Sequence, residues 1–444
     1  MAADAPPASS VVRDGLVWLF RHVIGVYFRD VEITGNLPAA DTAGRVFVSN
    51  HTNGLVDAVL VVTTARCRIS PIAKSTLWDI PGLRWLLDHA GAVPIVRRRD
   101  DPTKQAGSND AIFDKIAAAL STGSNILIFP EGTSHNEPRL IELKTGAARM
   151  LARAHEQGAR GLTFQAVALE FDERNVFRSR TLLVYGPVRP VPPVPPVGSL
   201  GLEGDALVKA ITDQIRDDLG ELLVEGATWP ERLLIARVAE MLANDTGDRS
   251  LEGWSSVGRR VEAARAALRG VDEATVDHVA GAVSRYYERL EEEGLADEQL
   301  ASHSDAAGVD TLADAALALS LPLAAAGVAL YAVPYQVTRL AARRITDSTD
   351  EVSTYKIGVG LLAYPVWAAA LTGAGFALLA PPLAAGFAAV VLTSPFAALA
   401  WQDAAPRVRR AVRFARRKGR LAELRALRAQ AMALVAATRS HLGM

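Results

Sequence analysis

His51 and Asp57 are the residues whose types and spacing point most directly to acid–base chemistry. They lie in VFVSNHTNGLVDAVL, residues 46–60, which is typical of an apolar strand, a turn and the start of a helix. An imidazole can accept a proton near neutral pH, and a carboxylate beside it fixes its tautomer. Because residues six apart do not share a helix face, the pair can meet only with His51 in the turn and Asp57 in the first helical turn.

A second segment, FPEGTSH (residues 129–135), follows another apolar run that predicts a strand. Gly132 would let the backbone approach a ligand closely, and the hydroxyls of Thr133 and Ser134 supply hydrogen-bond donors. These residues are therefore candidates for substrate binding.

Three further side chains complete this candidate set. Arg97 follows GAVPIV (residues 91–96), and an arginine at a strand end can hold a phosphate through two hydrogen bonds. We expect Glu131 to orient substrate hydroxyls, with a cap on a helix or strand as the alternative. His135 is expected to support the turn rather than act as a second base. A base, its orienting acid and a phosphate clamp at strand ends form one coherent chemical set.

These segments resemble the motifs of the glycerolipid (PlsC-like) acyltransferases, which esterify glycerol phosphate or its monoacyl derivative. SNHTNGLVD resembles their first motif, GAVPIVR their second and FPEGTSH their third. VALEF followed by FRSRTLLVYGPV resembles the fourth motif and its surroundings. The resemblance is specific from Arg45 to Val188.

One departure points to a subgroup. Five residues, 52–56, separate His51 from Asp57, whereas the common form of the first motif has four. The longer spacing resembles the enzymes that acylate glycerol 3-phosphate or dihydroxyacetone phosphate, as do IAKSTLWDIPGLRWLLDHAGAVPIVR and the lysine of LKTGAAR. Through this resemblance, Lys74 and Lys144 are assigned a phosphate or coenzyme role.

The resemblance implies acyl-CoA or an acyl-carrier-protein thioester as donor and glycerol 3-phosphate as acceptor. A 1-acylglycerol 3-phosphate or another lysophospholipid is the alternative acceptor. No cofactor is expected, and no metal, because no His, Cys and carboxylate cluster has ligand spacing. Two other classes are disfavoured: a lipid hydrolase, because the Gly-x-Ser-x-Gly elbow is absent, and a non-catalytic lipid-binding protein, because the candidate set is intact.

Length, composition and the hydrophobic pattern predict the domain organisation. The 444 residues suffice for two or three compact units, and half of them are hydrophobic. Apolar strands alternate with amphipathic helices over residues 37–190, which predicts an α/β domain with a mixed sheet flanked by helices. The Pro-rich residues 191–204 predict a stiff linker, and residues 205–308 a helical subdomain. The single cysteine, Cys67, is expected to be a packed small residue rather than an acyl-carrying nucleophile.

Residues 1–36 contain a mostly apolar stretch that carries four ionisable side chains, Arg13, Asp14, Arg21 and His22. Such charges make it a poor membrane span. Two expectations stay open: a helix at the membrane interface, which the aromatic residues Trp18, Phe20, Tyr27 and Phe28 suit, or a helix packed on the catalytic domain.

The membrane region is expected at residues 309–402. Ile357–Gln402 runs for two bilayer widths without an ionisable side chain other than tyrosine, and Pro381–Pro382 at its middle predicts a helical hairpin. Ala316–Val333 is shorter and contains Pro322, so it is expected to be interfacial or re-entrant. A buried soluble hairpin is the alternative.

Basic residues then predict the topology. Residues 403–444 form a basic C-terminal tail, with RVRRAVRFARRKGR at 407–420, and three arginines (Arg339, Arg343 and Arg344) precede the hairpin. The positive-inside rule favours two spans, with the tail and the catalytic domain on the cytoplasmic face. Beside a membrane hairpin, anionic phospholipid is the expected partner of the tail, and nucleic acid is not.

Overall fold

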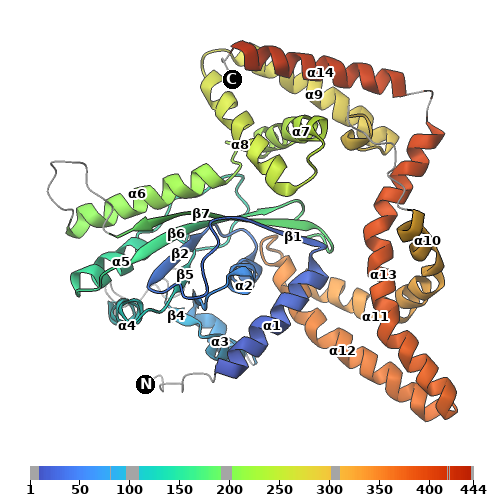
Figure 1. The fold of residues 1–444 in the computed structure, drawn as a ribbon, viewed down its shortest axis with the longest axis horizontal. Helices are drawn as coiled ribbons and strands as arrows, with labels where there is room; N and C mark the ends of the chain where they lie inside the picture. The colour runs from blue at the N-terminus through green and yellow to red at the C-terminus, as the bar shows by residue number, and fades with distance from the viewer. Residues whose placement is uncertain are drawn as a thin grey trace. The chain divides into compact units, whose positions relative to one another are not determined.

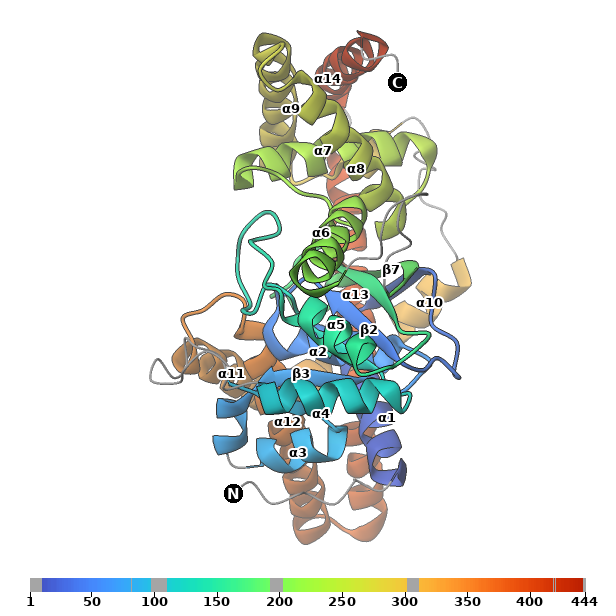
Figure 2. The same ribbon diagram turned by 90° about the vertical axis from the view of Figure 1, so that its left-hand side faces the viewer.

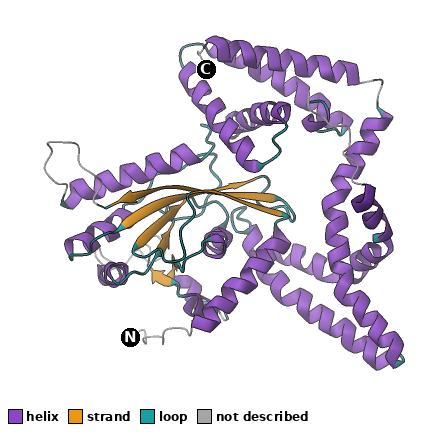
Figure 3. Ribbon diagram, viewed as in Figure 1, coloured by secondary structure: helices purple, strands orange, loops and turns teal. Residues whose placement is uncertain are grey.

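The computed structural model describes residues 10–80, 82–96, 110–191, 203–301, 311–417, 419 and 421–441. This part of the chain divides into two compact units, Met1–Leu223 and Val224–Met444. In the described residues every strand belongs to the first unit, and the second is helical (Figure 3). The fold class predicted from sequence, an α/β domain followed by a helical region with apolar helices, is confirmed.

A seven-stranded sheet forms the centre of the first unit in the described residues, with the order β1-β7-β6-β2-β5-β3-β4. Its strands are β1 (Asp30–Gly35), β2 (Arg45–Ser49), β3 (Ser70–Lys74), β4 (Val93–Ile95), β5 (Ile126–Ile128), β6 (Thr163–Phe171) and β7 (Arg180–Pro190). β6 and β7 are antiparallel, whereas the other neighbouring strands run parallel. The sheet is therefore mixed, as the sequence predicts.

The central strand β2 is buried on both faces, so functional residues can lie only at its ends. Val46, Phe47 and Val48 are completely buried, as expected for a parallel strand covered on both faces. The parallel strands β6, β2, β5, β3 and β4 end at the same edge of the sheet, and ligands of open α/β sheets bind outside the carboxyl ends of the strands.

The helices of the first unit are α1 (Ser10–Tyr27), α2 (Gly54–Thr64), α3 (Leu83–Ala90), α4 (Asp110–Ser121), α5 (Gly146–Glu156) and α6 (Gly204–Leu222), with a 3₁₀ turn at Ser75–Asp79. Figure 1 shows α6 lying along β6 and β7, and α4 and α5 lie side by side in Figures 1 and 2. The sequence predicts that α6 is part of the helical subdomain of residues 205–308. It belongs to the first unit instead, because its buried stripe covers the sheet and Arg189 of β7 pairs with Asp218 at 2.7 Å.

The aromatic residues of α1 do not all face outward. Tyr27 and Phe28 are buried, and Phe28 packs against Phe171 of β6 with ring centroids 5.9 Å apart. The burial of these two rings favours the packed-helix alternative for the end of α1, whereas Trp18 is 61% exposed. Arg21 donates a 2.8 Å hydrogen bond to the carbonyl oxygen of Thr63, so α1 is also fixed through its charged side chains.

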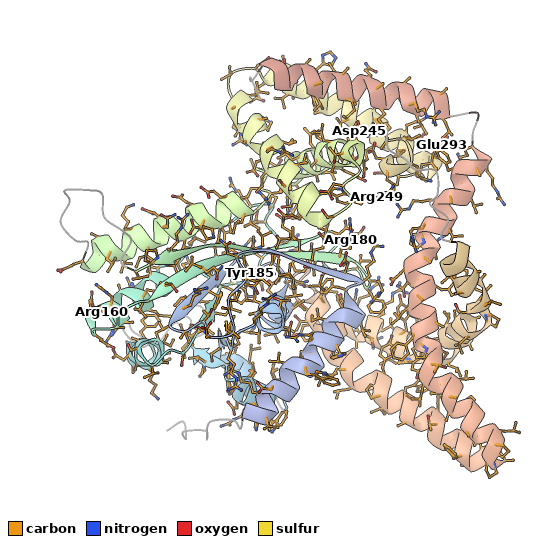
Figure 4. The ribbon with its side chains drawn as sticks, viewed as in Figure 1. Arg160, Arg180, Tyr185, Asp245, Arg249 and Glu293 are labelled. Carbon is orange, nitrogen blue, oxygen red and sulfur yellow. The ribbon has the colours of Figure 1, made fainter. Side chains whose placement is uncertain are left out.

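In the second unit, α7 (Trp229–Thr246), α8 (Leu251–Leu268), α9 (Glu273–Glu293) and the 3₁₀ turn Asp297–Gln299 share one hydrophobic core with α14 (Leu421–His441). The predicted tail is therefore not a separate extension, because α14 packs on α9. Buried Arg428 of α14 pairs with Asp297 at 2.7 Å and Asp245 at 2.9 Å, and these contacts fix α14 to the subdomain. Figure 4 labels Asp245.

The remaining helices are α10 (Thr311–Leu319), α11 (Leu321–Ile345), α12 (Val352–Leu378) and α13 (Pro381–Arg416). Of the described helices, α11, α12 and α13 are long and apolar enough to cross a membrane. The predicted break at the prolines lies between α12 and α13, where the chain turns at Leu379–Ala380. The segment expected to be interfacial or re-entrant is divided at Ser320, and α11 is longer than predicted, so its length also suits a span.

Candidate active site

His51 and Asp57 meet after the central strand, in the way their spacing predicts. His51 lies in the turn that follows β2, and its Nδ1 is 3.0 Å from Oδ2 of Asp57 in the first turn of α2. Asp57 is completely buried, and the same Oδ2 accepts hydrogen bonds from the backbone N–H groups of Thr52 (2.8 Å) and Asn53 (2.7 Å). An ionised carboxylate only accepts, so Nδ1 of His51 is the donor and Nε2 keeps its lone pair.

The His51 ring is held on its other sides as well. It stacks on Phe129, with ring centroids 4.1 Å apart and planes 17° apart. Its backbone N–H donates to Oε1 of Glu131 at 2.7 Å. The side chain nevertheless remains 18% exposed, so an acceptor group can reach it. This arrangement suits a general base whose tautomer and orientation are fixed before substrate arrives.

Glu131 lies behind His51 rather than beside a substrate. Its side chain is completely buried, and Oε2 accepts from Nε2 of His135 and from the backbone N–H of Ile141 at 3.2 Å. Since Oε1 is already bonded to His51, both carboxylate oxygens are occupied by the chain itself. We expected Glu131 to orient substrate hydroxyls; the geometry instead favours a supporting role shared with His135.

Asn50 and Arg174 were missed in the sequence, and both hold the site together. The Asn50 amide donates to the carbonyl of Leu169 (3.0 Å) and accepts from its N–H (2.8 Å), which fixes the turn to β6. Nη1 of Arg174 donates to the carbonyls of Thr52 (2.7 Å) and His135 (3.3 Å), joining the two motif loops. These partners lie far apart in sequence, so no local pattern marks them.

The glycine of the second motif has the backbone conformation its residue type favours. Gly132 has φ +74°, in the left-handed region, and its N–H closes a turn onto the carbonyl of Phe129 at 3.0 Å. Thr133 and Ser134 are half-buried, and Oγ1 of Thr133 donates to the carbonyl of Ser134 at 3.2 Å. This loop follows β5, the strand next to β2, so it lies at the same sheet edge as His51.

Lys74 and Lys144, two of the residues predicted to bind phosphate, differ in burial and in position. Lys74 is the last residue of β3 and is half-buried at the His51 edge of the sheet. Lys144 is largely exposed, with Nζ 3.6 Å from the exposed carboxylate of Glu142. Arg97 lies outside the described residues; β4, which ends at Ile95, reaches the same edge.

Residues 30–170 are similar to known acyltransferases. Residues 30–170 match the family model described as Acyltransferase. Over 137 residues the chain is 29% identical to a chloroplastic 1-acyl-sn-glycerol-3-phosphate acyltransferase of Arabidopsis thaliana, covering 31% of this chain and 36% of that protein. Residues 30–170 are therefore similar to the acyltransferase domains of glycerolipid biosynthesis.

Two other relatives differ in the acceptor that their names give. The lyso-ornithine lipid O-acyltransferase of Pseudomonas aeruginosa is 30% identical over 154 residues, which are 35% of this chain and 52% of that protein. Glycerol-3-phosphate O-acyltransferase 2 of Saccharomyces cerevisiae is 35% identical over 79 residues, 18% of this chain and 11% of that protein. The chain therefore spans only about a third to a half of the length of the first relatives it matches.

Cys67 lies away from the candidate active site. It precedes β3, so it is at the amino end of a strand whose carboxyl end faces the His51 edge. The residue is buried, and burial raises the pKa of its thiol, with Arg45 opposing the shift. Position and protonation both argue against an acyl-carrying role.

In the described ranges no group of three or more His, Cys, Asp or Glu side chains is arranged to hold a metal ion. The side chains gathered at the His51 edge are instead a base with its carboxylate and candidate donors for a phosphate or an oxyanion.

Proposed function

We propose that the protein transfers a fatty acyl group from acyl-CoA, or from an acyl-carrier-protein thioester, to a hydroxyl of glycerol 3-phosphate in phospholipid biosynthesis. The observation that carries the proposal is the partly exposed His51 ring, held through Nδ1 by the buried Asp57 within an acyltransferase domain. Such a pair can remove the proton of the acceptor hydroxyl. The reaction then requires neither a metal nor a covalent nucleophile.

In this mechanism Nε2 of His51 accepts the proton of the acceptor hydroxyl while its oxygen attacks the thioester carbonyl carbon. Asp57 stabilises the imidazolium that forms. Hydrogen-bond donors of the Gly132–Thr133 loop stabilise the tetrahedral oxyanion. The carbon–sulfur bond then breaks, the new ester is released, and the imidazolium returns its proton to the departing thiolate. No acyl-enzyme forms.

The acceptor phosphate needs cations at the same sheet edge. Arg97 is the proposed clamp, because a guanidinium holds a phosphate bidentately, and β4 ends two residues before it. Lys74 at the end of β3 would add a second positive charge, with Lys144 further out.

Three observations bear on the choice of acceptor. The five-residue spacing between His51 and Asp57 and the similarity to the yeast glycerol-3-phosphate acyltransferase favour glycerol 3-phosphate. The Arabidopsis relative favours 1-acylglycerol 3-phosphate as the alternative. The reaction and the proposed base are the same for both.

A competition assay separates these acceptors. Purified full-length protein in neutral detergent is given labelled palmitoyl-CoA, or labelled palmitoyl-carrier protein in a parallel arm, with equal concentrations of glycerol 3-phosphate and 1-acylglycerol 3-phosphate. Labelled lysophosphatidate is the expected product. Phosphatidate alone would assign the later acylation step, and transfer to neither acceptor from either donor would contradict the proposal.

The membrane setting is part of the proposal. Arginines follow the apolar part of α11 (Arg339, Arg343 and Arg344), and others follow that of α13 (Arg407, Arg409, Arg410 and Arg413). The positive-inside rule places both groups on the cytoplasmic face, with α12 and α13 as a hairpin between them. We propose that α11 returns to this face, since a full span would separate the preceding residues from cytoplasmic acyl-CoA.

A further inference from the structure

A pocket of about 280 Å³ lies in the second unit, where α13 leaves its apolar stretch. One wall is formed by three arginines of α13, Arg409, Arg410 and Arg413. The other is the turn that follows α9, Gly294–Ala296. Gly294 has a left-handed φ of +65°, which favours glycine, and a Cβ there would lie 2.2 Å from Nη1 of Arg413, so a larger residue would displace this guanidinium.

The arginines of this pocket are only partly neutralised. Arg410 pairs with Glu298 at 3.0 Å. Arg413 donates to the backbone carbonyl of Gly294 and Arg409 to that of Ala405, both at 3.3 Å, and no carboxylate in the described part of the chain pairs with either guanidinium. The pocket therefore carries two positive charges that lack a counter-charge.

A neighbouring carboxylate is already occupied. Glu293, labelled in Figure 4 at the end of α9, pairs with Arg417 beyond the pocket. The excess positive charge of the pocket is therefore available to an anion from outside the chain.

With α13 crossing the membrane as proposed above, the pocket would lie at the depth of lipid headgroups. From Pro381 to Gln402, α13 has no ionisable side chain, and the pocket begins at Pro406. With a rise of 1.5 Å per residue, its α13 residues lie roughly 6–16 Å beyond Gln402 along the helix. Helical side chains lean toward the helix N-terminus, so these arginines extend back toward the apolar stretch. A headgroup layer of roughly 5–8 Å is within their reach.

We propose that this pocket binds the phosphate of an anionic lipid headgroup. Arg409 and Arg413 supply charged donors that match phosphate oxygens, while Leu295, Ala296 and Pro406 offer apolar contacts to the glycerol part of the lipid. The apolar surface of α13 continues where the acyl chains would lie. A bound lipid would thereby attach the turn after α9 to the membrane surface.

The test uses full-length protein in neutral detergent, titrated with short-chain phosphatidylglycerol and followed by native mass spectrometry. The variant Arg409→Gln/Arg413→Gln is compared with Arg407→Gln/Arg416→Gln, which removes the same charge from the same helix at positions that do not line the pocket. We expect the pocket variant to bind about tenfold more weakly or worse, and the control to change by less than about twofold.

If both double variants bind phosphatidylglycerol equally weakly, the lipid is attracted by the overall positive charge of α13, and the proposal of a specific pocket is overturned. Inorganic phosphate in a separate arm distinguishes the source: if it binds the wild type more tightly than phosphatidylglycerol does, the lipid assignment is wrong. Thermal unfolding of each variant reports folding. If the double variant unfolds, Arg409→Gln alone, at an exposed position, is compared with Arg407→Gln and judged by the same criterion.

Discussion

The carboxylate of Glu131 accepts a 2.7 Å hydrogen bond from the backbone N–H of His51, so the third-motif acid holds the base by its main chain. Its second oxygen is occupied by His135 and by the N–H of Ile141. The buried Glu131 therefore joins the loop after β2 to the loop after β5, and we infer that it affects catalysis only through the position of His51, the proposed base.

Replacement of this carboxylate should first affect stability. In Glu131→Ala the buried N–H groups of His51 and Ile141 and the ring of His135 lose their acceptor, so we expect unfolding to become easier by about 3 kcal/mol. Glu131→Gln keeps one acceptor oxygen and should lose less. Thermal unfolding is measured together with the Michaelis constant for the acceptor. If a Glu131 variant has a higher Michaelis constant for the acceptor and an unchanged unfolding temperature, Glu131 orients the substrate after all.

Arg174 provides a second test of how the site is assembled. In Arg174→Ala the carbonyls of Thr52 and His135 lose a shared donor, and we expect kcat to fall by about tenfold because the two motif loops separate. Arg180→Ala is the matched control, since Arg180 (labelled in Figure 4) pairs with Asp172 near the same loop. Equal kcat losses in the two variants would remove the specific role of Arg174.

The sequence predicts the elements that carry the motifs, because each is a short apolar run followed by a turn. β3 was missed since it is short and contains Pro71, and proline is rare inside sheets. The sequence could not predict three contacts, those of Asn50 with Leu169, Arg174 with Thr52 and Arg428 with Asp297, because the two residues of each pair are more than 80 residues apart. Only the folded chain brings them together.

Cys67 should be dispensable for acyl transfer. Because burial raises the pKa of its thiol, the folded protein keeps it protonated at a pH where an exposed cysteine already ionises. Alkylation by iodoacetamide should therefore be slow at pH 8 and accelerate only as the pH rises further or the chain unfolds. Cys67→Ala should retain activity within about twofold. Loss of turnover with an intact fold would revive the acyl-carrier hypothesis.

This cysteine-free background allows the topology to be measured. Single cysteines replace Val271 before the membrane region, Ser348 between α11 and α12, and Ala380 between α12 and α13, all of them exposed. In sealed inverted and right-side-out vesicles, an impermeant maleimide should label Val271→Cys and Ser348→Cys from the cytoplasmic side and Ala380→Cys from the other. Opposite sides for residues 271 and 348 would mean that α11 spans the membrane.

The most direct measurement is acyl transfer by His51→Ala, beside His89→Ala as a control. His89 is a half-buried histidine of α3 that stacks on Trp85, outside the site. With labelled palmitoyl-CoA and the preferred acceptor, we expect His51→Ala to lose at least about a hundredfold in turnover while its circular dichroism and membrane association stay unchanged. His89→Ala should remain active. Substantial turnover by a folded His51→Ala protein would contradict the assignment of His51 as the base.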